Sequence, residues 1–141
     1  MVIMSVWDIG YSYNFFNQVF TRENKYNAYV ASLLDSTGNE TNIVGYIMLE
    51  LNRAEKHSYI QALYVEPAYR KNGIGTNLIN TAEDYSRSMG FKYISASVRD
   101  YLFRFYRKFG FSINSKITNW KYFISKNLVR EKELDDDVLE L

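Results

Sequence analysis

The segment Arg70-Lys71-Asn72-Gly73-Ile74-Gly75 combines residue types that can bind an anion. Two glycines one residue apart allow backbone N–H groups to converge on a phosphate-like group, and a helix that starts here adds the positive end of its dipole. Arg70 and Lys71 bring full positive charges to the same place. The spacing of a Walker loop is absent, and Leu78 stands where a dinucleotide fingerprint needs its third glycine. The segment therefore predicts an anion site of another kind.

The chain contains no cysteine and a single histidine, His57. The absence of cysteine excludes disulfides, thiolate metal sites and a cysteine nucleophile, and one histidine does not make a histidine-built metal site. We therefore expect no metal ion, and we expect that any group-transfer reaction proceeds without a covalent cysteine intermediate.

The anion-binding segment lies between a predicted strand over residues 58–65 and a predicted helix. The apolar residues that follow it recur at helical spacing and predict about four turns of amphipathic helix. These residues are Ile74, Leu78, Ile79, Ala82 and Tyr85, and Gly90 stands where a helix C-cap glycine is expected. A further strand is predicted over 93–98. Because the helix forms the crossover between the two strands, they should be a local parallel pair.

The remaining elements predict an α+β fold, in which a mixed central sheet of about six or seven strands has helices on both faces. We expect strands over 1–9, 26–34, 43–51, 111–113 and 120–124, a turn over 35–39, and helices over 12–20 and 101–109. Alternation of Ile43, Gly45, Ile47, Leu49 and Leu51 identifies the buried face of the third strand. We predict a single domain over 1–129, followed by an acidic C-terminal tail over 130–141.

The composition excludes several classes of protein. The length of 141 residues and 47% hydrophobic content suit one domain with a core. The formal net charge of +1 opposes a nucleic-acid binder, although Arg99, Arg104, Arg107 and Lys108 form a local basic group. No run approaches the ~18 apolar residues that span a bilayer, and the N-terminus lacks the features of a signal peptide. We therefore expect a cytoplasmic protein without nucleic-acid or membrane partners. The sequence leaves a homodimer open.

Two motifs in the same order resemble the GNAT superfamily of acetyl-CoA-dependent N-acetyltransferases. The order Arg70-x-x-Gly73-x-Gly75 resembles the family's pyrophosphate loop, and the preceding segment Leu63-Tyr64-Val65-Glu66-Pro67-Ala68-Tyr69 resembles its fourth strand and turn. The segment Phe105-Tyr106-Arg107-Lys108-Phe109-Gly110-Phe111 resembles a second family motif, and it follows after one further strand. The resemblance is specific over residues 58–111. It implies the GNAT fold, in which the pantetheine arm of the cosubstrate lies between the fourth and fifth strands.

The resemblance also implies which residues bind acetyl-CoA. They are Leu63, Tyr64 and Val65 in the fourth strand, Arg70, Lys71, Asn72, Gly73, Ile74, Gly75 and Thr76 in the loop, and Arg99 and Tyr106 beyond it. Backbone N–H groups of the fourth strand would bind the oxyanion of the reaction. Relatives often carry asparagine at the position of Arg99, so this contact with the pantetheine differs here.

The implied reaction needs a route for protons, because an alkyl amine with a pKa near 10 is almost wholly protonated at neutral pH. By resemblance, Tyr106 is the acid that protonates the leaving thiolate. Many relatives have a glutamate as base where this chain has Gln61, which can orient water but cannot accept a proton. The alternatives are Tyr59, Glu50 and His57, and we expect His57 to lie on the surface because it follows a turn.

The sequence therefore predicts an N-acetyltransferase in which a primary amine attacks acetyl-CoA directly. The acceptor amine belongs to a small molecule or a protein, and the Tyr59 position favours a protein or peptide amine. The alternative is a non-catalytic acyl-CoA-binding or interaction module with the GNAT fold. Gln61 favours the binding module, whereas Tyr106 favours the enzyme.

Overall fold

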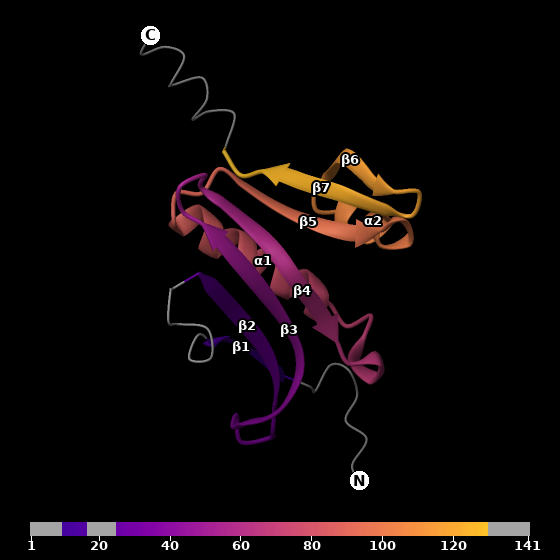
Figure 1. Ribbon diagram of the computed structural model, residues 1–141. Helices are drawn as coiled ribbons and strands as arrows, with labels where there is room; N and C mark the ends of the chain where they lie inside the picture. The colour runs from indigo at the N-terminus through magenta and orange to yellow at the C-terminus, as the bar shows by residue number, and fades with distance from the viewer. Residues whose placement is uncertain (1–9, 17–24, 130–141) are drawn as a thin grey trace. The chain divides into compact units, whose positions relative to one another are not determined.

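The computed structural model describes residues 10–16 and 25–129 (Figure 1). Its contacts divide the chain into two compact units. Unit one comprises Met1–Leu51 and Ile60–Asp84, and unit two comprises Asn52–Tyr59 and Tyr85–Leu141. Seven strands follow the order β1-β2-β3-β4-β5-β7-β6 in the sheet. The structure thus confirms the α+β class, whereas the predicted single domain over 1–129 stays a prediction.

Unit one contains β1 (Gly10–Phe16), β2 (Tyr26–Leu34), β3 (Glu40–Asn52) and the end of β4 (His57–Val65). Strands β1 and β2 are antiparallel, as are β2 and β3. The predicted turn between β2 and β3 is present, and the Asp35 carboxylate accepts bonds from the backbone N–H groups of Thr37 and Asn39, each at 2.9 Å. This side chain closes the turn in the manner typical of aspartate.

Helix α1 (Ile74–Ser88) begins in unit one and packs on β3 (Figure 1). The face of β3 that meets the helix is the one that alternation predicts, since Ile47, Leu49 and Leu51 are buried. A Cβ on Gly45 would stand 3.0 Å from the carbonyl oxygen of Tyr64 and 3.2 Å from Cγ2 of Ile74. Glycine is therefore needed here, because β4 and the first turn of the helix both approach this backbone closely.

Unit two contains β5 (Tyr93–Arg99), α2 (Asp100–Arg107), β6 (Ser112–Thr118) and β7 (Lys121–Asn127). Strand β7 pairs antiparallel with both β5 and β6, so the two strands predicted over 111–113 and 120–124 are present and are longer than predicted. The start of β4 lies beside β5, because the N–H of Lys92 donates to the Lys56 carbonyl at 2.7 Å and His57 Nε2 bonds Ser95 Oγ. From the first contact to the second, the residue number rises on both strands, as expected of a parallel pair.

The helix predicted over 12–20 is wrong for residues 12–16, which belong to strand β1. The sequence Gly10–Phe16 reads GYSYNFF, and its aromatic residues favour a strand. Residues 17–20, the strand predicted over 1–9 and the tail over 130–141 lie outside the described residues. Among the described residues, no helix is long and apolar enough to cross a membrane.

Candidate active site

The segment from Arg70 to Gly75, which the sequence predicts to bind an anion, connects the end of β4 with the start of α1. The N–H of Glu66 donates to the Val44 carbonyl at 2.8 Å, which holds the end of β4 on β3. A short 3₁₀ turn over Pro67–Tyr69 then leads into two left-handed residues, Lys71 at φ 66° and Gly73 at φ 81°. Left-handed residues in a turn can direct successive backbone N–H groups toward a common point, as they do in anion-binding nests.

The start of α1 adds further donors to this loop. Its first backbone bond runs from the N–H of Asn77 to the Gly73 carbonyl at 3.0 Å. The N–H groups of Ile74, Gly75 and Thr76 therefore precede the first intrahelical donor and have no intrahelical acceptor, as in any helix N-terminus. Of the two loop glycines, Gly73 alone is left-handed, whereas Gly75 lies within the helix. The conformational need for glycine is thus at Gly73, where a Cβ would meet nothing within 4 Å.

The side chains of the loop divide into those that face solvent and those that hold the loop. Arg70 Nε donates to the Val65 carbonyl at 2.8 Å, and its guanidinium lies 5.8 Å from the centroid of the Tyr64 ring. Asn72 Nδ2 donates to the Tyr69 carbonyl at 3.1 Å, and Lys71 is exposed. The side chain of Ile74 is buried in the core, so this residue can offer a ligand only its backbone N–H.

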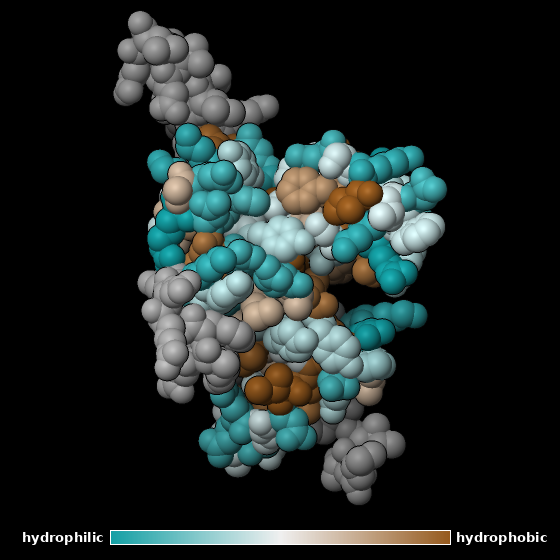
Figure 2. All heavy atoms as spheres, viewed as in Figure 1, coloured by the Kyte–Doolittle hydropathy of each residue, from teal (hydrophilic) through white to brown (hydrophobic). Residues whose placement is uncertain are grey.

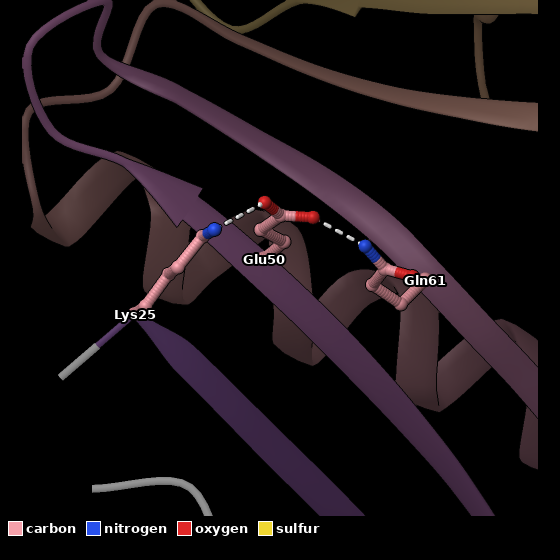
Figure 3. Close-up of polar contacts among 3 residues, drawn as sticks. All are labelled: Lys25, Glu50 and Gln61. Carbon is pink, nitrogen blue, oxygen red and sulfur yellow. Dashed lines mark hydrogen bonds and ion pairs between the residues drawn. The ribbon is translucent and has the colours of Figure 1, made fainter. Parts of the chain in front are cut away.

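Glu50 and Gln61 lie together on adjacent strands of unit one, as Figure 3 shows. Gln61 Nε2 donates to Glu50 Oε2, and Lys25 Nζ lies 3.2 Å from Glu50 Oε1. A carboxylate only accepts, so the donor in the first contact must be the amide nitrogen of Gln61. Its carbonyl oxygen is then left to accept a bond from another group. The structure therefore places a carboxylate within reach of the position at which many relatives carry their basic glutamate.

Tyr106 is buried in unit two among aromatic rings. The side chain of Tyr106 is 6% exposed. Its ring lies edge-on to two others, with 5.4 Å between ring centroids for Phe105 and 5.5 Å for Phe111. In the part of the chain that the structure describes, its hydroxyl has no hydrogen-bond partner. Burial raises the pKa of Tyr106 to about 12, so the hydroxyl stays protonated at neutral pH. A buried, unpaired and protonated hydroxyl is an unsatisfied donor that a ligand could use.

Three other residues named from the sequence have simpler surroundings. Tyr59 is half-buried on β4, two residues before Gln61, and Arg99 is exposed at the junction of β5 and α2. The prediction that His57 lies on the surface is wrong. This side chain is half-buried because β5 lies beside the start of β4. It bonds Ser95 Oγ, and its ring centroid lies 5.4 Å from that of Tyr93.

Sequence reasoning missed Lys25. Its backbone carbonyl accepts a bond from the N–H of Leu51 at 2.7 Å, which brings its side chain beside Glu50. The signal that could have found it is the register set by the 35–39 turn, because this register pairs the residues before Tyr26 with those after Glu50. Among the described residues, no group of three or more histidine, aspartate or glutamate side chains could hold a metal ion.

The comparison with protein families identifies the fold. The model described as the acetyltransferase (GNAT) family matches residues 4–111 of this chain. The chain belongs to the GNAT acetyltransferase family. The match covers the loop, Glu50, Gln61 and Tyr106, so the resemblance and the GNAT fold predicted from the sequence are confirmed. No curated protein matches the chain in sequence.

Solved structures of the family share the fold at low sequence identity. An aminoglycoside 6'-N-acetyltransferase with coenzyme A has 20% identity over 77% of this chain and 76% of its own, with a TM-score of 0.65. Mutant forms of the spermidine/spermine N-acetyltransferase SpeG from Vibrio cholerae have 19% identity over 85% and 76%, with a TM-score of 0.63. The PaiA N-acetyltransferase from Thermoplasma acidophilum with coenzyme A has 20% identity over 71% and 60%, with a TM-score of 0.57. Acetyl-CoA fits the family as cosubstrate.

Proposed function

We propose that this chain is an N-acetyltransferase that moves an acetyl group from acetyl-CoA to a primary amine. The observation that carries the proposal is the loop before α1, where left-handed Lys71 and Gly73 precede the free N–H groups of a helix start. Such a loop fits a pyrophosphate, because backbone donors, the helix dipole and two cationic side chains favour the same anion. The loop from Arg70 to Thr76 binds this group in our proposal.

The remaining contacts with the cosubstrate follow the family pattern. Leu63, Tyr64 and Val65 offer backbone groups to the pantetheine and to the oxygen of the acetyl group, and Arg99 offers a cation. Acetyl-CoA supplies an acetyl group activated as a thioester. The overall reaction forms an amide bond, breaks the thioester and releases coenzyme A thiol and one proton.

Glu50 is the group best suited to take a proton from the acceptor. Only about one alkyl amine in a thousand is neutral at pH 7, so a base or a water-linked exit must deprotonate the acceptor before it can attack. Gln61 cannot accept a proton, but its amide fixes one oxygen of Glu50, and its own carbonyl oxygen can accept a bond from water or the amine. Tyr59 remains the alternative on β4. The attack is direct, because the chain has no cysteine to carry the acetyl group.

Tyr106 acts on the sulfur of the leaving group in our proposal. Its pKa of about 12 lies above the ordinary thiol pKa of ~8.5, so complete proton transfer to a thiolate is uphill. A hydrogen bond to the developing thiolate does not carry this cost, and it would satisfy the unpaired hydroxyl. We therefore assign Tyr106 the role of a hydrogen-bond donor that stabilises the sulfur as the thioester breaks.

The acceptor is a primary amine of a small molecule or of a protein or peptide. The named substrates of two solved neighbours are spermidine or spermine and an aminoglycoside, all of which carry several amines. These neighbours share the fold at about one-fifth identity, so they support the reaction class more than the choice of acceptor. A homodimer stays a prediction.

The loop is tested by a matched pair of glycine substitutions. Gly73 and Gly38 have φ values of 81° and 83°, and a Cβ on either would meet nothing within 4 Å. Alanine at either position should cost about 1–2 kcal/mol of folding free energy, because both backbones are left-handed. Gly73→Ala should also weaken coenzyme A binding roughly tenfold or more in calorimetry, whereas Gly38→Ala should not. Equal affinities in the two variants would show that the loop is only a turn.

Gln61 favours one other function, a module that binds acyl-CoA without transferring the acyl group. It replaces the carboxylate of many relatives with a group that cannot accept a proton. The hydrogen bond between Gln61 and Glu50 opposes this alternative, because it holds the carboxylate of Glu50 beside Gln61, where it can accept a proton. Release of thiol by the parent chain, measured with a panel of amines and N-terminal peptides, separates the two functions. Coenzyme A binding without any thiol release would support the module.

A further inference from the structure

One face of the sheet in unit one is turned away from α1. Gly45 marks the face that meets the helix, so Val44, Tyr46, Met48 and Glu50 alternate onto the opposite face. Figure 3 shows the side chain of Glu50 on the near side of the sheet, with the helix behind the strands. In unit one, α1 is the only helix of more than one turn among the described residues, so no described helix of this unit covers the face that carries Glu50.

Glu50 on this face already binds a primary ammonium group, that of Lys25. The two side chains are 30% and 45% exposed, respectively, and the ammonium lies 5.6 Å from the centroid of the Tyr26 ring. Because Gln61 bonds the other carboxylate oxygen, Glu50 is held in one orientation toward the ammonium (Figure 3). Lys25 thus presents the same chemical group that a protonated amine acceptor would bring.

The surroundings of Glu50 are aromatic and apolar. The register of β2 and β3 places Tyr26 opposite Glu50 and Ala28 opposite Met48. Cross-strand neighbours have Cβ atoms about 4.5–5.5 Å apart, so an aromatic ring joined to an ammonium by two carbons could reach Tyr26 and Met48 from Glu50. Figure 2 views this face, where brown and pale side chains lie over β2 and β3. Met48 is half-buried, and its flexible thioether packs well against rings.

The charges on the same strands disfavour an acceptor with several cations. Strands β2, β3 and β4 carry one carboxylate besides Glu50, and this is Glu40 at the far end of β3. Toward the other end of β4, Tyr64 contacts Tyr46 with ring centroids 5.9 Å apart, and the Arg70 guanidinium lies over Tyr64. A second ammonium at that end of the strands would meet the Arg70 guanidinium.

We propose that Glu50, Tyr26 and Met48 form the acceptor site, and that it takes one primary ammonium attached to an aromatic body. Lys25 is the specificity-determining residue of this site, because its ammonium competes with the acceptor for Glu50. An exposed ion pair contributes little free energy, so an acceptor can replace Lys25 at small cost. The inference rests on the proposed function. The required chemistry occurs in a free arylalkylamine and in the N-terminus of a peptide that begins with phenylalanine.

The test measures steady-state acetylation by the full chain with four acceptors. These are phenethylamine, butylamine, 1,4-diaminobutane and a short peptide that begins with phenylalanine. The aromatic ring should raise kcat/KM for phenethylamine roughly tenfold over that for butylamine, because ring contacts and the burial of the ring both favour phenethylamine. The diamine should be no better than butylamine. If kcat/KM is larger for phenethylamine than for the peptide, the acceptor is a free arylalkylamine. If it is larger for the peptide, the acceptor is a peptide N-terminus.

Lys25→Met should lower KM for phenethylamine about two- to fivefold with kcat unchanged, because the competing ammonium is removed. Glu50→Gln should raise KM by more than tenfold and also lower kcat. Lys92→Met, which removes an exposed lysine from unit two, is the matched control and should leave both constants at the parent values. A KM in Lys25→Met that is unchanged or higher overturns the role of Lys25. A diamine preferred over phenethylamine overturns the acceptor class.

Direct binding of phenethylamine distinguishes a failure of the proposed transferase activity from a failure of the proposed acceptor site. If the parent releases no thiol with any acceptor, the proposed transferase activity fails, and phenethylamine is titrated into each variant by calorimetry. The proposed acceptor site is then supported only if phenethylamine binds Lys25→Met two- to fivefold more tightly than the parent and binds Glu50→Gln more weakly than the parent. Absence of binding in all variants overturns the acceptor site as well.

Discussion

Tyr106 provides the most direct test at the scale of a single residue. Tyr106→Phe removes the hydroxyl, which has no partner among the described residues, and keeps the ring that packs against Phe105 and Phe111. Loss of a hydrogen-bond donor aimed at developing charge costs about 10²–10³ in turnover, so kcat should fall by that factor. Coenzyme A affinity should change little. Saturation kinetics and calorimetry on one preparation measure both quantities, and Tyr93→Phe, an exposed tyrosine of unit two, is the control.

The pH dependence of this effect has a defined sign. The pKa of Tyr106 is raised to about 12, so its hydroxyl is protonated at every pH below that value. The parent should therefore show no loss of rate from ionisation of Tyr106 up to about pH 11, and the ratio of parent to Tyr106→Phe turnover should be constant with pH. A ratio that falls toward one near pH 10 would contradict the raised pKa. Turnover within a few-fold of the parent would leave Tyr106 as a packing residue.

Residue types in a fixed order could be read from the sequence, whereas contacts across strands could not. The loop residues from Arg70 to Gly75 are consecutive, so their spacing alone is enough to predict an anion site. Lys25 is distant in sequence from Glu50, and their ion pair depends on the register of β2 and β3. That register contains irregularities near Ser32, which no pattern of hydrophobic residues indicates.

At the scale of elements, the turn between β2 and β3 makes a testable contribution to stability. Asp35 Oδ1 accepts bonds from Thr37 Oγ1 at 2.6 Å and from the N–H of Asn39 at 2.9 Å. The bond from the Thr37 hydroxyl, followed by that from the Asn39 backbone, holds the pKa of Asp35 below its usual value. Asp35→Ala should lower the melting temperature at neutral pH, because the turn loses the acceptor that closes it.

The stabilisation by Asp35 should disappear in acid. Since its folded pKa is below the unfolded one, the contribution is present above the unfolded pKa and is lost as pH falls below the ordinary aspartate value of ~3.9. Thermal melts across this range should show the parent and Asp35→Ala converging as pH falls. Glu55→Ala removes an exposed carboxylate from the next turn and is the control. A difference in melting temperature that is constant with pH would argue that the turn does not depend on the charged form.

The elements that the sequence predicted well are those whose periodicity is long. The buried face of β3 and the buried stripe of α1 follow from five apolar positions each, and the structure confirms both apart from the exposed Ile43 and the half-buried Tyr85. The segment over 12–16 is short and aromatic, so helical spacing and strand propensity compete there, and the strand prevails. The burial of His57 depends on a strand far along the chain and has no local signal.

At the scale of the whole molecule, the order of elements was predictable but their grouping into units was not. Strand β4 and helix α1 each begin in one unit and end in the other. Hydrophobic periodicity identifies an element, but it carries no information about which end of that element belongs to which compact unit. Family membership covers residues 4–111, and thus parts of both units.

The Asn72-Gly73 pair of the loop has a consequence for how the protein ages. An asparagine followed by glycine deamidates readily, because the glycine nitrogen can attack the side-chain amide without hindrance from a Cβ. The bond from Asn72 Nδ2 to the Tyr69 carbonyl restrains that amide. When this amide reacts, hydrolysis leaves an aspartate or isoaspartate in the loop, and the net charge falls from +1 to 0. Stored protein should therefore form a more acidic species on isoelectric focusing, and this species should have lost affinity for coenzyme A, whereas Asn72→Gln should form none.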